Sequence, residues 1–347
     1  MPYEIPAPML AKSVPEIPDP AKTPGGLSFE PKWDGFRGLV SWDGETVEIG
    51  SRGAKPLTRY FPELVEAFSR LLPEPCLIDG EVVVPKGDRG AQRLDWDSLT
   101  QRIHPAASRV KMLSETTPAM FIAFDLLARG DRDLQGESFA ARRAQLVDLL
   151  GGLPHPVHVT RTTEDPDLAR RWLDEFEGAG LDGVIAKPLA QPYAPNKRSM
   201  FKIKHARTAD VVALGYRVHK SGQGVGSLLV GLYVDGELHN VGAVSAWTDK
   251  RRLELVDELA PLVQTDESGE ALTGEGEKSR FSAAGRDSSF VKLRPELVLE
   301  VKYDQLEGWR FRHTVQFARW RPDRDPASCT FDQLESVSAF DVGAVLE

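Results

Sequence analysis

Cysteine is scarce in this sequence of 347 residues, and long apolar runs are absent from it. Its two cysteines, Cys76 and Cys329, cannot build a disulfide framework or a four-thiolate zinc site, so we expect a protein of the reducing cytoplasm. No apolar run is long enough to span a bilayer, which predicts no membrane association. The start of the chain has neither a basic region nor an apolar core, so we expect no signal peptide.

Positive charge is also in short supply, since the net charge is -9 and the pI is about 5.4. Taken as a whole, this balance disfavours a nucleic-acid binder, whose footprint is usually basic. Lysine and arginine nevertheless gather in two segments, 201–220 and 309–324. Phosphate binding needs only a local positive potential, so a substrate that carries phosphates remains compatible with the composition.

Several common catalytic signatures are missing. The glycine-rich segment 221–227 lacks the Gly-Lys-Ser/Thr ending of a P-loop, so we predict a hairpin loop there and no site. No cluster of His, Cys and Glu has zinc spacing, and no G-x-S-x-G elbow occurs. These absences exclude the simplest nucleotide, zinc and serine-hydrolase interpretations.

The first part of the chain, residues 1–205, mixes strand patterns with helical patterns. Helical spacing occurs at 137–150 and 166–179, and continuous apolar runs such as "AMFIAFDLLA" are typical of buried strands. These features predict an α+β domain with strands from distant parts of the chain. Two Asp-Gly pairs also predict hairpin turns: Asp43-Gly44 and Asp79-Gly80.

The second part, residues 206–347, is rich in short strands and punctuated by glycine. One helical stretch interrupts the strands at about 249–263. Five short strands and a helix suit a small β-barrel such as an OB-fold. We therefore predict a domain boundary near residue 205 and a second domain that is an OB-fold barrel.

Lys32 stands in "LSFEPKWDGFRGLV", between an apolar run and the Asp34-Gly35 pair. A lysine in this setting is most often an exposed side chain beside a turn. It can also act as a nucleophile in phosphoryl chemistry if nearby cations or burial favour its neutral amine. Glycine at position 35 would let the turn form without a side-chain clash.

Lys202 and Lys204 in "MFKIKH" alternate with apolar residues. Period two places both lysines on one face of a strand, where they could bind a phosphate as two point charges. Glu81 in "IDGEVVV" could bind a metal ion or a ribose hydroxyl. Phe124 in "FIAFDLL" could stack on a base. Each feature by itself has a simpler structural explanation as core or solvated surface.

The order of the motifs is more specific than any one of them: "KWDGFR", "SRG", "DGE", "FDLL", "DGVIAK", "FKIK" and "RWRPDR". This series resembles the nucleotidyltransferase superfamily of ATP-dependent DNA ligases, RNA ligases and mRNA-capping enzymes, and the resemblance covers essentially the whole chain. "APMLAK", "GVGSLLVGLY" and "FRHTVQFARWRPD" are similar to the short bacterial DNA ligases of the LigC type. The resemblance implies an adenylyltransferase domain of the ATP-grasp-like ligase kind, with antiparallel sheets and helices, at 1–205 and an OB-fold domain at 206–347.

The resemblance also implies roles for residues around the nucleotide. Lys32 matches the lysine that attacks the α-phosphate of ATP and becomes lysyl-AMP. Glu30 matches the residue that reads the adenine edge, and Phe124 matches the aromatic side chain that stacks on adenine. Arg37 and Arg52 match residues that contact the ribose and the DNA phosphate.

The remaining matches concern the phosphates and a metal ion. Glu81 matches an acid that holds the ribose or a metal, and Asp182 stands where the family usually has glutamate. Aspartate is still a hard oxygen ligand, so we expect Asp182 to bind Mg²⁺ or Mn²⁺. Further matches contact the nucleotide: Lys187, which follows the acid of the fourth motif; Lys202 and Lys204 at the α-phosphate; and Arg321, Asp323 and Arg324, which swing over the pyrophosphate.

Together these matches predict an ATP-dependent DNA ligase that seals nicks in double-stranded DNA through lysyl-AMP and DNA-adenylate. An RNA ligase or a capping enzyme would share most of this pocket. An NAD-dependent ligase is disfavoured, because 31 residues precede Lys32 and a four-cysteine zinc module is missing. A catalytically silent OB-type binding module is disfavoured by the presence of Lys32, Glu81, Lys202 and Lys204 together.

The resemblance further predicts a monomer in the bacterial cytoplasm, associated with the nucleoid and active in DNA repair. Because the chain is acidic, we expect it to bind DNA alone weakly and in a salt-sensitive way. A repair polymerase, a primase or a DNA end-binding protein would then be its partner at breaks.

Overall fold

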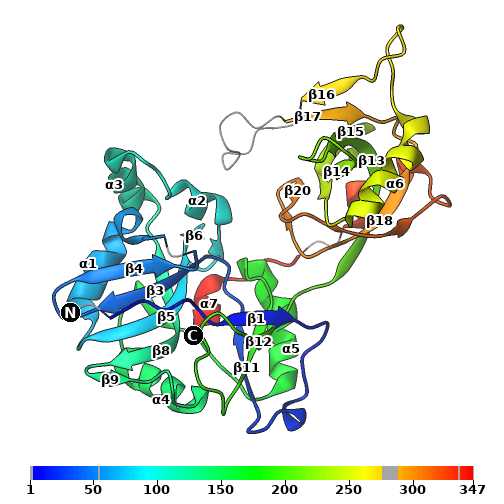
Figure 1. Cartoon of the computed structure of the whole chain (residues 1–347). Helices are drawn as coiled ribbons and strands as arrows, with labels where there is room; N and C mark the ends of the chain where they lie inside the picture. Colours follow the sequence, from blue (N-terminus) through cyan, green and yellow to red (C-terminus); the bar gives the residue numbers. More distant parts are fainter. Residues whose placement is uncertain (1–2, 54, 276–287, 335–336, 347) are drawn as a thin grey trace. The chain divides into compact units, whose positions relative to one another are not determined.

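The protein consists of two compact units (Figure 1). The first comprises Met1–Lys204 together with Val337–Glu347, and the second comprises His205–Ser336. The sequence-based division differs from this at its end, because it assigns all of 206–347 to the second domain. The correction has a simple cause: helix α7 (Val342–Leu346) buries two valines in the core of the first unit. The computed structural model describes these residues: 3–53, 55–275, 288–334 and 337–346.

Two mainly antiparallel sheets build the first unit. The smaller has the strand order β1-β12-β11-β2, and the larger has the order β10-β8-β5-β3-β4, with β9 paired to β8. Only β1 with β12 and β10 with β8 are parallel among the pairs described here. The strands are β1 (Leu10–Ser13), β2 (Leu27–Pro31), β3 (Phe36–Trp42), β4 (Val47–Ser51), β5 (Cys76–Val83), β8 (Met120–Arg129), β9 (Arg132–Asp133), β10 (Val157–Val159), β11 (Val184–Pro188) and β12 (Arg198–Ile203), with a small hairpin of β6 (Pro85–Lys86) and β7 (Arg93–Leu94).

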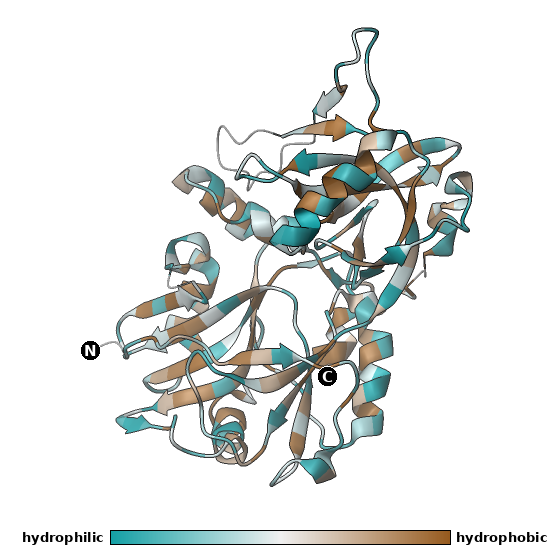
Figure 2. Ribbon diagram, turned by 45° about the vertical axis from the view of Figure 1, so that its right-hand side comes forward, coloured by the Kyte–Doolittle hydropathy of each residue, from teal (hydrophilic) through white to brown (hydrophobic). Residues whose placement is uncertain are grey.

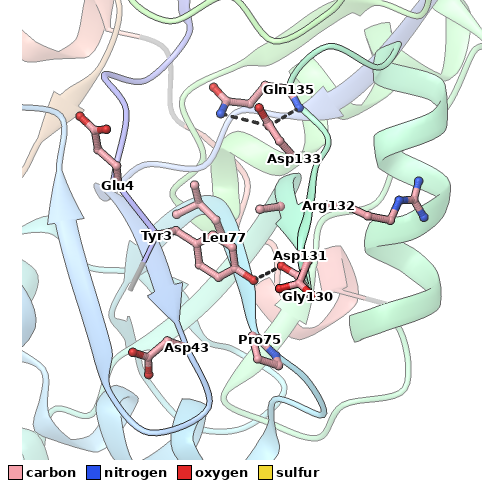
Figure 3. Close-up of a pocket in the computed structure, with 11 residues that line it drawn as sticks. Tyr3, Glu4, Asp43, Pro75, Leu77, Gly130, Asp131, Arg132, Asp133 and Gln135 are labelled. Atoms are coloured by element: carbon pink, nitrogen blue, oxygen red, sulfur yellow. Dashed lines mark hydrogen bonds between the residues drawn. The ribbon is translucent and has the colours of Figure 1, made fainter. Parts of the chain in front are cut away.

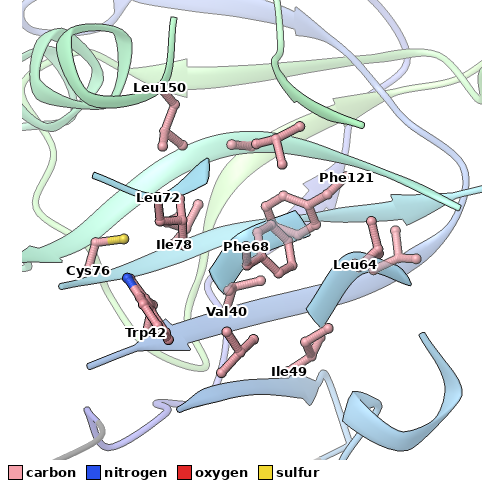
Figure 4. Close-up of a cluster of buried hydrophobic side chains, with 14 of the residues drawn as sticks. Val40, Trp42, Ile49, Leu64, Phe68, Leu72, Cys76, Ile78, Phe121 and Leu150 are labelled. Carbon is pink, nitrogen blue, oxygen red and sulfur yellow. The ribbon is translucent and has the colours of Figure 1, made fainter. Parts of the chain in front are cut away.

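Helices pack on these sheets through apolar faces. In α1, Leu64 and Phe68 lie one turn apart and are buried, so the helix presents one apolar stripe to the larger sheet. The ring of Phe68 meets the ring of Phe121 edge-on, with 5.1 Å between their centroids (Figure 4). The helices of the first unit, besides α7, are α1 (Pro62–Leu71), α2 (Trp96–Gln101), α3 (Ala107–Thr116), α4 (Phe139–Leu150) and α5 (Pro166–Glu175), which runs into the 3-10 turn η3 (Phe176–Ala179).

Of the two Asp-Gly pairs predicted to form hairpin turns, one does and one does not. Asp43-Gly44 does join β3 to β4, but Asp79-Gly80 lies inside β5, so that prediction is wrong. A side chain at Gly80 would start 2.3 Å from the ring of Phe121, and the register shifts by one residue at this point. The glycine therefore marks a bulge and a close ring contact instead of a turn.

The Asp34-Gly35 segment is also not a hairpin, because it connects two different sheets. It carries the chain from β2 of the smaller sheet to β3 of the larger one. A Cβ atom on Gly35 would lie 2.2 Å from the carbonyl oxygen of Val82. The crossover thus needs glycine where it passes the backbone of β5.

The second unit is built around one curved sheet with the order β15-β14-β13-β17-β16, in which β13 also pairs with β18 and β18 with β21. It contains more strands than the five predicted, while helix α6 lies within the predicted helical stretch. In Figure 2 the strands of this unit carry both apolar and hydrophilic residues, and α6 carries many hydrophilic ones. The elements are β13 (Arg207–Val218), β14 (Val225–Val234), β15 (Glu237–Val244), α6 (Asp249–Leu259), β16 (Thr273–Glu275), β17 (Ser289–Lys292), β18 (Val298–Tyr303), β19 (Leu306–Glu307), β20 (Arg310–Phe311) and β21 (Gln316–Trp320).

Neither unit contains, among the described residues, a helix long and apolar enough to span a bilayer. The glycine-rich segment 221–227 includes the hairpin connection between β13 and β14, as predicted.

Candidate active site

Lys32 follows the last residue of β2, beside the segment that precedes β11. Its backbone N–H donates to the carbonyl of Gly183 at 2.8 Å, and its carbonyl accepts from the N–H of Asp182 at 3.0 Å. These bonds fix the backbone of both residues, and the side chains then meet with Lys32 Nζ 2.5 Å from Asp182 Oδ2. Asp182 is 5% exposed and Lys32 21% exposed, so the amine sits at an accessible rim above a buried carboxylate.

Two further lysines join this pair: Lys202 comes from β12, the neighbour of β11, and Lys204 follows the last residue of β12. Lys204 Nζ lies 2.8 Å from the same oxygen of Asp182. Lys202 is partly buried, and burial lowers its pKa, with the cations of Lys204, Lys32 and the exposed Arg52 acting in the same direction. The alternation predicted for "MFKIKH" is confirmed, since Ile203 points into the core. The result is a local cluster of positive charge around Lys32.

Glu30 and Lys187 form a buried ion pair on the adjacent strands β2 and β11. Glu30 stands opposite Ile185, so Lys187 is its diagonal neighbour on the same face. Lys187 Nζ is 2.8 Å from Glu30 Oε1 and donates to the carbonyl of Phe124 at 3.1 Å. Burial raises the pKa of Glu30, although Lys187 opposes the shift. The other oxygen, Oε2, is buried and has no hydrogen-bond partner among the described residues, so it can accept a hydrogen bond from a ligand.

Two cations, Lys187 and Arg37, lie against the ring of Phe124. Lys187 Nζ is 4.7 Å from the ring centroid and the guanidinium carbon of Arg37 is 4.5 Å from it. Phe124 itself is nearly buried. Arg37 also belongs to a hydrogen-bond network with Asp79 and Tyr193, which the sequence did not predict. Arg37 donates to both oxygens of Asp79 at 2.5 and 2.6 Å, and Tyr193 donates its hydroxyl to Asp79 at 2.7 Å.

Asp79 was expected in a turn and Tyr193 was not singled out. Both are buried, and Tyr193 also accepts from the backbone N–H of Met9 at 3.0 Å. Desolvation of the Arg37 guanidinium is outweighed by the Asp79 carboxylate, which raises the pKa of Arg37. The signal that could have identified Asp79 is its position among the apolar residues of a strand, where an unpaired charge is too costly.

Glu81 is the direct cross-strand neighbour of Arg37. Burial raises the pKa of Glu81 to about 7, while the charges of Arg37 and Lys32 oppose that shift. The carboxyl group is thus held near Lys32 in an environment where its protonation changes near neutral pH.

Trp33, next to Lys32, anchors the crossover segment. Its side chain is 5% exposed, and its indole N–H donates to Thr160 Oγ1 at 2.8 Å. Thr160 is fully buried and its carbonyl accepts from Arg143. Because Trp33 is buried, the neighbouring Lys32 is held in a fixed direction.

The final motif, residues 319–324, lies in the second unit at the end of β21, and Arg321, Asp323 and Arg324 follow that strand. Arg321 contacts both carboxylate oxygens of Asp210 at 2.9 Å and pairs with Asp323 at 2.9 Å. Arg324 Nε lies 3.5 Å from Asp210. Asp210, which was not singled out from the sequence, therefore holds both arginines.

Comparisons with known proteins identify the family of this chain. The model of the "ATP dependent DNA ligase domain" family matches residues 8–204, and that of the "ATP dependent DNA ligase C terminal region" matches 221–324. The chain belongs to the ATP-dependent DNA ligases. Its predicted enzyme class, its resemblance to the LigC type and its fold class are thereby confirmed.

Two named relatives are similar to this ligase over almost their whole length. DNA ligase C1 of Mycolicibacterium smegmatis is 56% identical over 98% of this chain and 97% of its own. DNA ligase C of Mycobacterium tuberculosis is 54% identical over 95% of this chain and 93% of its own. Among solved structures, a Lig E DNA ligase matches with a TM-score of 0.56 and 17% identity, covering 92% of this chain and all (100%) of its own, which shows a shared fold.

The family implies a divalent cation, and two carboxylates near Lys32 could supply part of its coordination shell. No group of three or more His, Cys, Asp or Glu side chains among the described residues is spaced to hold a metal alone. Glu81 and Asp182 both act on Lys32, by charge and by contact respectively. Mg²⁺ is usually coordinated by one or two carboxylates, with substrate phosphates and water as the other ligands, and these two side chains fit that pattern.

A separate pocket of this ligase is lined by none of the predicted site residues (Figure 3). Among its lining residues are Glu4, Asp43, Asp131 and Asp133, and Tyr3 donates its hydroxyl to the carbonyl of Gly130 at 2.5 Å. Its acidic lining would repel phosphate groups, so the nucleotide is not assigned to it.

Proposed function

We propose that this ligase seals nicks with a 5′-phosphate and a 3′-hydroxyl, and that Lys32 is its nucleophile. The observation that carries this proposal is the position of Lys32, whose amine lies at an accessible rim and shares Asp182 with Lys204. A carboxylate within hydrogen-bond distance gives the ammonium proton an acceptor before attack. Adjacent cations then favour a neutral amine and bind the phosphate that it attacks.

The first step forms a P–N bond between Lys32 Nζ and the α-phosphorus of ATP and breaks the bond to the β-phosphate oxygen. Pyrophosphate leaves with the electron pair of that bond. Lys202 and Lys204 would neutralise the α-phosphate, because nucleotidyl transfer depends mainly on positioning and charge stabilisation. Arg321 and Arg324 would bind the departing pyrophosphate, with Asp323 orienting Arg321.

The nucleoside would be held by the buried residues on the other side of Lys32. Glu30 Oε2, which has no partner within the described parts of the chain, would accept a hydrogen bond from the amino group of adenine, and Phe124 would stack on the base. Lys187 would orient Glu30, and Glu81 would hold the ribose or a metal ion. A Mg²⁺ or Mn²⁺ ion held by Glu81 and Asp182 would screen the negative charge of the phosphates.

In the second step an oxygen of the 5′-phosphate at the nick attacks the AMP phosphorus, and the P–N bond to Lys32 breaks. In the third step the 3′-hydroxyl attacks the activated 5′-phosphorus, and AMP leaves. Arg37 and Arg52 would contact the ribose and the nick phosphate. The strand is thus restored at the cost of one ATP.

The test is covalent labelling with α-labelled ATP. Lys32→Ala should abolish the label, because it removes the amine that is proposed to attack the α-phosphorus. Lys22→Ala, at an exposed lysine of the same unit, is the matched control and should label like the wild type. A Lys32→Ala chain that still takes up AMP covalently would disprove the assignment of the nucleophile.

The acidic total charge supports a further part of the proposal, that a partner brings this monomeric ligase to DNA breaks in the nucleoid. We infer a repair polymerase, a primase or a DNA end-binding protein as the kind of partner, because a net charge of -9 weakens attraction to DNA. Nick affinity should rise when cell extract is added, and equal affinity with and without extract would count against a partner.

A further inference from the structure

The last described residues, 337–346, are called the tail here, and they lie on the first unit although they follow the second unit in the sequence (Figure 1). Two hydrogen bonds attach the tail to Gln92. The N–H of Gln92 donates to Asp341 Oδ1 at 2.7 Å, and the N–H of Val342 donates to the carbonyl of Gln92 at 2.8 Å. The tail is therefore held by specific backbone contacts.

Apolar contacts complete the attachment at η3. The ring of Phe340 lies 5.2 Å from the ring of Phe176, measured between centroids. A Cβ atom on Gly178 would lie 2.0 Å from the carbonyl oxygen of Ser338, so only glycine leaves room for the tail backbone. Val342 and Val345 are buried completely or nearly so. This surface of the first unit thus fits the tail closely.

The apolar cluster that receives these valines reaches the back of the active site. It also contains Trp33, Leu181 and Ile203. Each is an immediate neighbour in sequence of a residue at the phosphate side of the site, respectively Lys32, Asp182 and the pair Lys202 and Lys204. In β12 successive side chains point to opposite faces, so the burial of Ile203 directs Lys202 the other way. Lys32 and Asp182 lie outside the strands, and the burial of Trp33 and Leu181 restricts the backbone that carries them.

We propose that the tail is a positioning element for lysine adenylylation. By completing the cluster around Trp33 and Leu181, it keeps Lys32 and Asp182 in the geometry needed for attack on the α-phosphate. Displacements of about 1 Å can slow an enzymatic step on the order of 100-fold. This inference rests on the proposed role of Lys32, and it adds a requirement for residues more than 300 positions further along the chain.

The test compares two variants of the full-length ligase. Val342→Ala combined with Val345→Ala removes buried methyl groups of the tail, while Val337→Ala changes an exposed valine (42% exposed) of the same segment. At saturating ATP, we expect the double variant to form lysyl-AMP on the order of 10- to 100-fold more slowly, with a smaller change in the KM for ATP. The control variant should match the wild type.

A second readout separates positioning from loss of folded protein. Lys32 is not the nucleophile when a pre-adenylylated nick is sealed, so the double variant should retain most of that activity. An unchanged rate of lysyl-AMP formation would overturn the proposal. Equal losses in both reactions, in proportion to the folded fraction, would overturn it as well. A wild-type chain that takes up no label would instead overturn the proposed function, and the tail proposal with it.

Discussion

Asp182 in the first unit and Asp210 in the second each pair with two cations, but the cations differ in kind. Asp182 holds Lys32 and Lys204 at 2.5 and 2.8 Å, whereas Asp210 holds Arg321 and Arg324 at 2.9 and 3.5 Å. A lysine can lose its proton in a suitable environment, while a guanidinium remains charged. The first arrangement can therefore generate a nucleophile, and the second can supply only permanent positive charge.

The two units also differ in where they keep charge. Among the described residues, buried charged side chains occur in the first unit and none occurs in the second. Burial of an ion pair strengthens its electrostatic interaction and fixes its geometry, at a high desolvation cost. The first unit thus keeps a rigid, charged interior for nucleotide chemistry, while the charges of the second unit stay near water. The buried set comprises Glu30, Asp79, Arg102, Asp125, Arg142, Glu177, Asp182 and Lys187.

The largest expected effect is on the rate of lysyl-AMP formation when the carboxylate of Asp182 or of Asp210 is replaced. Asp182→Asn should slow lysyl-AMP formation on the order of 100- to 1,000-fold, because Lys32 loses both its anchor and its nearest proton acceptor. Asp210→Asn should cause a smaller loss, since Arg321 keeps Asp323 as a partner. Single-turnover labelling with α-labelled ATP measures both rates. Equal losses in the two variants would show that the kind of cation does not matter.

A second prediction compares a buried ion pair with an exposed one. Arg142 donates to both oxygens of Asp125 at 2.8 and 2.9 Å, and both side chains are buried. Asp125→Ala leaves an uncompensated guanidinium and should lower the free energy of unfolding of the first unit by about 3–5 kcal/mol. Arg319→Ala removes the exposed pair with Glu300 in the second unit and should cost less than about 1 kcal/mol.

Denaturant unfolding, followed by probes in each unit, measures both changes. The first-unit midpoint should fall in Asp125→Ala and stay unchanged in Arg319→Ala. If both variants lowered the free energy of unfolding by a similar small amount, burial would not determine how much these ion pairs contribute to stability.

The smallest expected effect concerns pH. Burial lowers the pKa of His158 to about 4 from 6.5, and the neighbouring His155 acts in the same direction. Between these values the unfolded chain binds more protons than the folded one, so the unfolding free energy of the first unit should fall as pH drops from 6.5 to 4. His158→Gln should flatten that slope, and His239→Gln, at a half-exposed histidine of the second unit, should not.

Unfolding titrations at fixed denaturant across this pH range provide the measurement. A slope that is the same in His158→Gln and in the wild type would assign the pH dependence to other groups.

The order of short motifs was enough to bring Lys32, Lys202, Lys204 and Asp182 to one place, because a strand pattern fixes which side chains share a face. It could not reveal that Asp182 pairs with the lysines themselves. That contact depends on the crossover after β2, where the Lys32 carbonyl accepts from the N–H of Asp182, 150 positions away, and the Lys32 N–H donates to the carbonyl of Gly183. The roles assigned to these residues remain predictions.

Other features escaped sequence reasoning for physical reasons. Asp79-Gly80 has the composition of a turn, and only the ring of Phe121 against Gly80 explains why it lies in a strand. Trp33 had no evident role until its partner Thr160, 127 positions away, was known. The tail is a short segment whose apolar residues show no pattern until the surface that receives them is seen.

The tail also constrains when the ligase can become active during its synthesis. Gln92 and Asp341, which it joins, are 249 positions apart, so the ribosome must translate the whole second unit before this contact forms. Contacts between such distant segments form late, because a long loop has to close first. A nascent chain that has completed both sheets of the first unit would still lack the last side of the cluster behind Lys32, so, on the proposed role of the tail, lysyl-AMP formation would stay slow until the tail emerges.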